Sequence, residues 1–124
     1  MDALEQIAIE ITQSAPLPDA VLERAVTEIC KQGGHVNIAA LVAHVGISRR
    51  TLERRFLAHI GLTPKRWCRV ARFQAALMAM ETRGGNGWAD FAHHLGYADQ
   101  AHFSREFSEF AGVPPTAAWW TMNR

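Results

Sequence analysis

The stretch that decides the fold is "GISRRTLERRF", residues 46–56, which places four arginines within seven positions, interrupted by one glutamate. Gly46 is typical of a helix end and Ser48 of a helix N-cap. The pattern therefore predicts a turn followed by a helix to about residue 60. A basic run of this kind is usually a solvated helix face, and the alternative is a surface that binds a polyanion. The charged residues are Arg49, Arg50, Glu53, Arg54 and Arg55.

A second copy of this region follows about 50 residues later. "IAALVAHVGISRRTLERRFLAHIGLTP" superposes on "WADFAHHLGYADQAHFSREFSEFAGVPP" at an offset of 50 up to the first glycine and of 51 after it. Arg54 then matches Arg105, and Phe56 matches Phe107. Each copy predicts a short helix, a glycine turn and a longer helix, which is a helix-turn-helix present twice.

The remainder of the chain also predicts helices and no strands. The sequence contains an apolar stripe at helical spacing, several N-cap residues, and glycines or prolines that end helices. Together these features predict an all-α fold. Helices are expected over about 4–11, 20–32, 37–45, 48–60, 64–82, 88–95, 99–111 and from 115 onward, with a turn at "RGGNG", residues 83–87. The predicted organisation is an N-terminal amphipathic helix and linker (1–18), a first helix-turn-helix unit (19–63), a linker helix (64–82) and a second helix-turn-helix unit (83–124).

A helical wheel separates the arginines of the first copy into two kinds. With Leu52 at zero, Phe56 and His59 fall on the inward face, and Arg50 and Arg54 lie about 160° and 200° away. Arg49 and Arg55 flank the inward face, and Leu57 shares the outward side. In the second copy the wheel predicts an aromatic inward face (Phe103, Phe107, Phe110) and a polar outward one (Ala101, Ser104, Arg105, Ser108), with Glu106 where the first copy has Arg55.

The net charge of +1 conceals a basic centre, because residues 49–72 hold eight basic side chains and one acidic one. Such a centre attracts polyanions through its local field. No apolar run is long enough for a membrane span, and the N-terminus is not a signal peptide. We therefore expect a cytoplasmic protein with no membrane contact, in which Cys30 and Cys68 are reduced, core or half-buried thiols.

We find no catalytic or metal-binding motif in the sequence. It contains no HExxH, no GxSxG and no Cys/His pair with zinc spacing, so neither an enzyme nor a metal or other cofactor is predicted. The aromatic residues Trp67, Phe73, Trp88 and Phe91 are expected in the core.

The motifs resemble the DNA-binding domain of AraC/XylS-type transcription regulators. The resemblance runs from about Asp19 to Trp120 and is strongest in "GYADQAHFSREFSEFAGVPP", residues 96–115. "GISRRTLERRFLAHIGLTPKRW", residues 46–67, fits the first unit and the start of the linker helix. The resemblance implies about seven helices, with two helix-turn-helix units joined by a long linker helix. It also implies transcription regulation, with both recognition helices entering successive major-groove segments of double-stranded DNA, about 34 Å apart.

The resemblance places base-contacting residues at Arg50, Glu53, Arg54, Gln100, Ala101 and Arg105. Ala101 is a departure, because it can contact a thymine methyl group but cannot hydrogen-bond a base. Ala118 is a second departure, since the family usually has an aromatic residue there, and Trp119 and Trp120 follow it. Flanking side chains and helix N-termini suit phosphates. These are Ser48, Arg49, Arg55, Lys65, Arg66, Arg69, His102 and Ser104.

Three partner questions stay open at the level of sequence. Recruitment of RNA polymerase, which would make the protein an activator, is suggested by the resemblance alone. Most members of the family carry an effector-sensing or dimerisation domain, so the chain is either a C-terminal fragment of a longer regulator or a free-standing short member. A different class of function is a helical protein-interaction module whose basic face docks an acidic partner. The arginines at matched positions, Arg54 and Arg105, favour DNA over that alternative.

Overall fold

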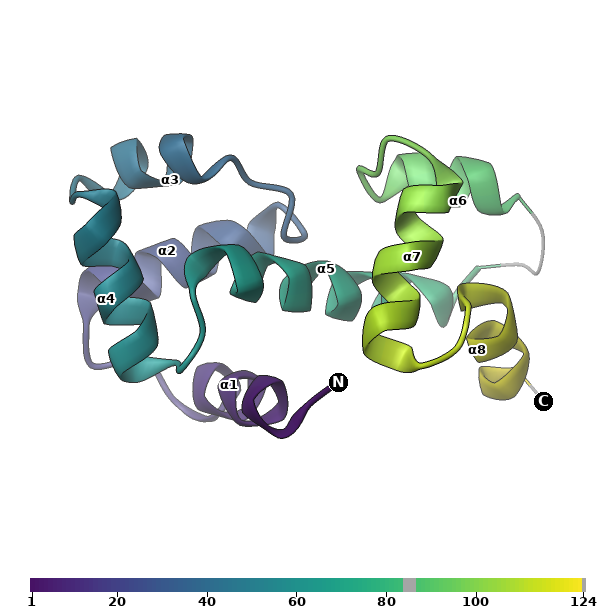
Figure 1. The fold of residues 1–124 in the computed structure, drawn as a ribbon, viewed down its shortest axis with the longest axis horizontal. Helices are drawn as coiled ribbons and strands as arrows, with labels where there is room; N and C mark the ends of the chain where they lie inside the picture. The colour runs from purple at the N-terminus through teal and green to yellow at the C-terminus, as the bar shows by residue number, and fades with distance from the viewer. Residues whose placement is uncertain (84–86, 124) are drawn as a thin grey trace. The chain divides into compact units, whose positions relative to one another are not determined.

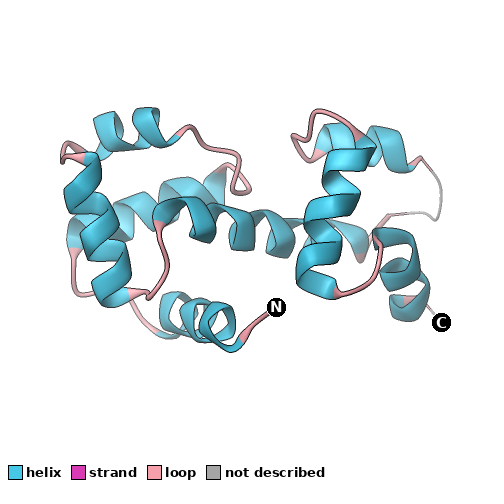
Figure 2. Cartoon of the chain, viewed as in Figure 1, coloured by secondary structure: helices cyan, strands magenta, loops and turns pink. Residues whose placement is uncertain are grey.

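The computed structural model describes residues 1–83 and 87–123, and every regular element in these ranges is an α-helix (Figure 2). The helices are α1 (Ala3–Ser14), α2 (Ala20–Lys31), α3 (Ile38–Val45), α4 (Arg49–His59), α5 (Pro64–Met80), α6 (Trp88–His94), α7 (Gln100–Ala111) and α8 (Pro115–Met122) (Figure 1). The predicted all-α fold is confirmed. The seven helices implied by the resemblance are α2–α8, and α1 precedes them.

The chain forms two compact units, and the boundary between them falls inside α5. The N-terminal unit comprises Asp2–Ala71, and the C-terminal unit comprises Arg72–Arg124 together with Met1. Each unit contains one complete helix-turn-helix, which is α3 with α4 in the first and α6 with α7 in the second.

Side-chain caps start the helices where the sequence predicts them. The carboxylate of Asp19 accepts hydrogen bonds from the backbone N–H groups of Val21 (3.0 Å) and Leu22 (3.1 Å). Ser48 caps α4 by accepting from the backbone of Thr51 at 3.1 Å, and Asn37 and Asp99 do the same for α3 and α7. The turn predicted at residues 83–87 includes 84–86, which lie outside the described residues.

The two helix-turn-helix turns are built on glycines at matched positions. Gly46 and Gly96 have φ values of +77° and +99°, in the left-handed region that side-chain-bearing residues rarely adopt. The matched glycines thus end the first helix of each helix-turn-helix, α3 or α6, and redirect the chain into the second, α4 or α7.

The core of the N-terminal unit is aliphatic, with one phenylalanine and one tryptophan. α2 packs against both α3 and α4, as Figure 1 shows. The largest fully buried side chains here are Leu22, Ile29, Leu52, Phe56, Trp67 and Val70. Cys68 is buried beside them in α5, as predicted, whereas Cys30 is exposed.

The core of the C-terminal unit is aromatic. Phe73 of α5 lies 5.1 Å from Phe107 and 5.3 Å from Phe110, measured between ring centroids. Phe103 lies 5.8 Å from Phe107 and 5.9 Å from Phe91. Tilted and edge-on pairs at these distances add to the free energy of burial, so α7 is fixed in its unit by ring packing.

Two of the four aromatic residues predicted for the core are only half-buried. Trp67 and Phe73 are buried, whereas Trp88 and Phe91 are partly exposed. The guanidinium of Arg83 covers both rings, 3.9 Å from the centroid of Trp88 and 4.5 Å from that of Phe91. A cation over the ring faces takes the place of apolar neighbours at this edge of the unit.

The last helix packs through one tryptophan of its pair. The indole N–H of Trp119 donates a hydrogen bond to the backbone carbonyl of Arg83 at 3.2 Å, and Trp119 is half-buried. Trp120 is 67% exposed. The departure at Ala118 is thus followed by an indole that anchors α8 to its unit.

Candidate nucleic-acid interface

Helix α4 presents its arginines as the wheel predicts. Leu52 and Phe56 are 0% exposed and face the core of the N-terminal unit. Arg50 and Arg54 are exposed on the opposite side, and within the described residues neither has a hydrogen-bond or ion-pair partner. Two guanidinium groups, four residues apart, are therefore available to an external ligand.

The wheel is wrong at His59, which it places on the inward face. His59 is exposed, because α4 ends at this residue and the chain turns there. Ile60, the C-cap residue, is 2% exposed and fills the core at that point instead. A wheel assumes a helix of unlimited length, and the helix end breaks the assumption.

Arg49 and Glu53 form a pair on the exposed side of α4. The guanidinium Nε of Arg49 lies 3.0 Å from a carboxylate oxygen of Glu53, at i, i+4 spacing. Both side chains are more than 40% exposed, at 61% and 43%. The pair orients the Glu53 carboxylate, which is predicted to contact a base, on the exposed side of the helix.

Arg55 is tied to the start of α2. Its Nη1 lies 3.1 and 3.2 Å from the two carboxylate oxygens of Asp19, the residue that caps α2. The backbone N–H of Leu22 and then the Arg55 guanidinium lower the pKa of Asp19. Arg55 thus links the recognition helix to the helix behind it, and any phosphate contact by Arg55 would share this guanidinium with Asp19.

Helix α7 repeats the arrangement with fewer charges. Phe103, Phe107 and Phe110 are buried as predicted. Its outward side has one cation, Arg105, which is exposed and without a polar partner in the described part of the chain. The other predicted contact residues are Gln100, Ala101 and His102, which are exposed, and Ser104, which is half-buried.

The sequence did not predict the buried carboxylate of Glu106, which lies in the middle of α7. Glu106 is 6% exposed and accepts hydrogen bonds from Arg72 Nε at 2.6 Å, Arg72 Nη2 at 3.3 Å and the Tyr97 hydroxyl at 3.3 Å. His102 Nε2 lies 3.5 Å from the same carboxylate. Burial, and then the Glu106 carboxylate, raise the pKa of Tyr97. The sequence did contain one indication of this site. A glutamate that flanks the aromatic face of a helix becomes buried with that face, and a buried carboxylate needs a cation nearby.

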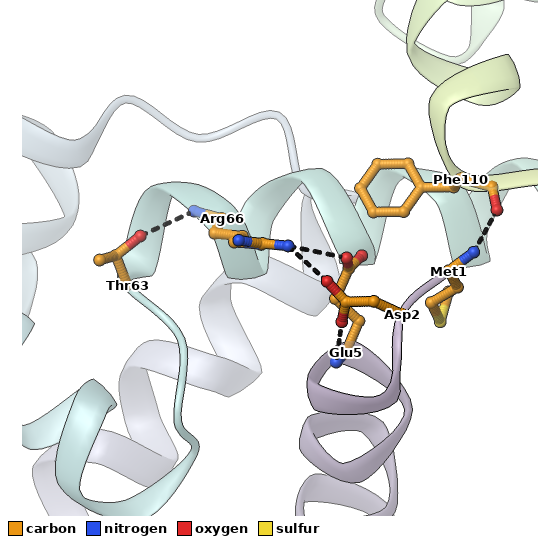
Figure 3. A network of polar contacts seen from close by, with 6 residues as sticks. All are labelled: Met1, Asp2, Glu5, Thr63, Arg66 and Phe110. Carbon is orange, nitrogen blue, oxygen red and sulfur yellow. Dashed lines mark hydrogen bonds and ion pairs between the residues drawn. The ribbon is translucent and has the colours of Figure 1, made fainter.

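The cations at the start of α5 differ in their availability. Lys65 is exposed, whereas the Arg66 guanidinium lies 2.7 Å from Asp2 and 3.0 Å from Glu5 of α1 (Figure 3). Hydrogen bonding to Glu5, which is 5% exposed, raises the pKa of Arg66. Lys65, Arg66 and Arg69 line a depression of about 180 Å³ with Thr63.

The described residues hold no cluster of three or more His, Cys, Asp or Glu side chains arranged to bind a metal ion. Over the same residues, the longest helices are too short or too polar to cross a membrane.

The fold and the duplicated motif define a helix-turn-helix protein. The family model described as "Helix-turn-helix domain" matches residues 41–118, which is more than half of the chain. An AraC-like transcription regulator from Streptomyces lividans is 32% identical over 103 residues, or 82% of this chain and 33% of that protein. The transcriptional regulator YidL of Escherichia coli is 33% identical over 81 residues, or 65% of this chain and 27% of that protein.

A third relative is the transcriptional activator RhaS of Pectobacterium carotovorum, 31% identical over 90 residues, or 72% of this chain and 32% of that protein. No solved structure matches the chain. The chain belongs to the AraC family and is a helix-turn-helix DNA-binding domain of a transcription regulator. It spans about a third or less of the length of these curated relatives.

Proposed function

We propose that this domain binds double-stranded DNA sequence-specifically, with α4 and α7 each entering a major-groove segment and the two segments following one another along the duplex. The observation that carries the proposal is the pair of exposed arginines at matched positions, Arg54 and Arg105. An arginine on a recognition helix can donate two hydrogen bonds to the N7 and O6 acceptors of guanine. A surface that only docks an acidic protein does not require the same side chain at the same position of two helices.

The six base-contacting residues have distinct roles in this proposal. Arg50, Arg54 and Arg105 donate to purine acceptors, and Gln100 pairs with adenine. Glu53, oriented by Arg49, accepts from the amino group of cytosine, and Ala101 contacts a thymine methyl group. The two halves of the site therefore differ in base preference, because the two helices present different groups.

The phosphate contacts are proposed for side chains around these helices. Ser48, Lys65, Arg69, His102 and Ser104 contact the DNA backbone, together with Arg49, Arg55 and Arg66, whose guanidinium groups lie against carboxylates in the free protein. Phosphate contacts position the protein and carry the dependence on salt. The remaining partners implied by the family, RNA polymerase and an effector-sensing domain, are proposals for the whole regulator.

A binding selection tests the proposal. The 124-residue chain is mixed with random duplexes at moderate salt, and the bound fraction is sequenced after several rounds. We expect enrichment of two short motifs whose centres lie about one helical turn apart. Retention of all duplexes alike, or of none, would exclude base-specific binding, and binding to an acidic polypeptide instead would favour the docking alternative.

A further inference from the structure

Helix α4 carries one large apolar side chain that is exposed. Leu57 is 53% exposed, whereas Leu52 and Phe56 of the same helix are 0% exposed. A single exposed leucine is ordinary on a protein surface, so exposure alone indicates no partner. What distinguishes Leu57 is its position on the helix.

Leu57 continues the stripe of base-contacting residues. Arg50, Glu53, Arg54 and Leu57 follow the spacing i, i+3, i+4, i+7, which places them on one face of a helix. Leu57 lies about 10 Å along the axis from Arg50, at 1.5 Å of rise per residue. This is roughly three base steps of 3.4 Å, so a helix lying along the groove brings Leu57 to a different base pair from Arg50.

The chemistry of the groove leaves a leucine few favourable contacts. The thymine C5-methyl group is the apolar feature of the major-groove base edges, which otherwise present hydrogen-bond donors and acceptors. Against a thymine, Leu57 removes both apolar groups from water. Against another base it covers donors or acceptors without satisfying them, which is unfavourable.

The C-terminal unit lacks this group. Ser108 of α7 occupies the same wheel position as Leu57 and carries a hydroxyl group that can donate and accept hydrogen bonds. A contact with a methyl group at this position is therefore expected from α4 and not from α7.

We propose that Leu57 contacts the C5-methyl group of a thymine in the segment bound by α4 and so determines specificity at a base pair beyond those of Arg50, Glu53 and Arg54. This inference rests on the proposed function, because it requires α4 to lie in the major groove.

Single thymine-to-uracil replacements test it, because uracil lacks only the methyl group. The site enriched by the full chain is synthesised with uracil at one thymine at a time, and the half bound by α4 is recognised as the half whose preference Arg54→Ala relaxes. We expect one uracil in that half to weaken binding about fourfold, the factor for losing burial of one methyl-sized group. With Leu57→Ser, which copies the residue of α7, this penalty should disappear while penalties elsewhere in the site persist.

The outcomes separate the inference from the proposed function. If the α4 half contains no thymine, if none of its uracil replacements weakens binding, or if the penalty survives Leu57→Ser, the role of Leu57 is overturned while DNA binding stands. If the selection enriches no duplex, the proposed function itself fails. Even if Leu57→Ser is poorly folded, the uracil series on the unaltered protein can overturn the role of Leu57, because an α4 half without a uracil penalty excludes a methyl contact.

Discussion

Each recognition helix forms an ion pair with another helix of its unit from the same matched position, but the helix supplies the cation in α4 and the anion in α7. Arg55 of α4 pairs with Asp19, and Glu106 of α7 pairs with Arg72. The first pair is partly exposed, with side-chain exposures of 37% for Arg55 and 17% for Asp19, whereas the second is buried, with 18% for Arg72 and 7% for Glu106. The duplication thus keeps the apolar inward face of each helix, while the charged contact beside it differs in sign and in depth.

The difference in burial decides how much each pair contributes. An exposed pair is screened by water and contributes little, whereas removing one partner of a buried pair leaves a charge without solvent or counter-charge. The two helices also differ in total charge, because α4 contains four arginines and α7 contains one. We expect α7 to depend more on its internal pair, and α4 to supply more of the electrostatic attraction.

The largest effect is expected from breaking the buried pair. Arg72→Ala leaves Glu106 buried, with the Tyr97 hydroxyl and His102 still beside its carboxylate. We expect the C-terminal unit to lose about 3 kcal/mol of unfolding free energy, whereas Arg55→Ala should cost the N-terminal unit about 0.5 kcal/mol. Hydrogen exchange of the α7 and α4 amides measures the two units separately.

A second substitution shows whether the buried charge causes that loss. Glu106→Gln in the Arg72→Ala background removes the unpaired charge and should recover a large part of the stability. Equal losses for Arg72→Ala and Arg55→Ala would contradict the difference between the two pairs.

The next effect concerns the matched arginines. Arg54→Ala and Arg105→Ala should each cost about 1–3 kcal/mol of binding free energy and relax preference at one base position, in different halves of the site. Quantitative gel shifts with single-base variants of the selected site measure both changes. A uniform loss over all sequences would make these arginines phosphate contacts instead.

The caps give a smaller comparison between the units. Asp19 caps α2 and pairs with Arg55, whereas Asp99 caps α7 and, among the described residues, has no ion pair. Asp19→Ala should cost about 1–2 kcal/mol and Asp99→Ala about 1 kcal/mol, as measured by denaturant unfolding. The excess for Asp19 should vanish in the Arg55→Ala background.

The Asp19 effect should also depend on pH. The pKa of Asp19 is lower in the folded protein than its ordinary value of 3.8, so its contribution is complete above that value and is lost as the pH falls through the folded pKa. The penalty of Asp19→Ala should therefore be full at neutral pH and should shrink below about pH 4. A penalty that stays constant into acid would mean that the ionised carboxylate contributes nothing.

Most of the fold follows from local chemistry that the sequence displays. Asp19, Ser48 and Asp99 predict helix starts, and the matched glycines predict the turns, because caps and left-handed residues act over three or four positions. The outward placement of Arg50 and Arg54 follows from helix periodicity. These features need no knowledge of distant parts of the chain.

What the sequence does not predict depends on tertiary contacts. The burial of Glu106 requires Arg72, 34 residues away, and the pairing of Arg66 requires Asp2 and Glu5 of α1. His59 is exposed because the helix ends there, and Trp88 is half-buried because Arg83 covers its ring. Helix periodicity shows that a side chain flanks the buried face of its helix, but it does not show which distant residues the fold places beside that side chain.

The smallest expected effect compares two neighbouring cations of α5, one exposed and one held by carboxylates. Lys65 is exposed, and Arg66 is held by Asp2 and Glu5. If Lys65 contacts a phosphate, Lys65→Ala should lower the slope of log affinity against log salt by about 1, equally for all sequences. Arg66→Ala should change the slope less, because a phosphate contact by Arg66 must first displace two carboxylates. In the Asp2→Asn background one of these carboxylates is removed, so the slope change caused by Arg66→Ala should come closer to that of Lys65→Ala. Salt titrations of the unaltered protein, the three single variants and the double variant of Asp2→Asn and Arg66→Ala on one duplex make the measurement. A larger slope change for Arg66→Ala than for Lys65→Ala would show that α1 releases Arg66 when DNA binds.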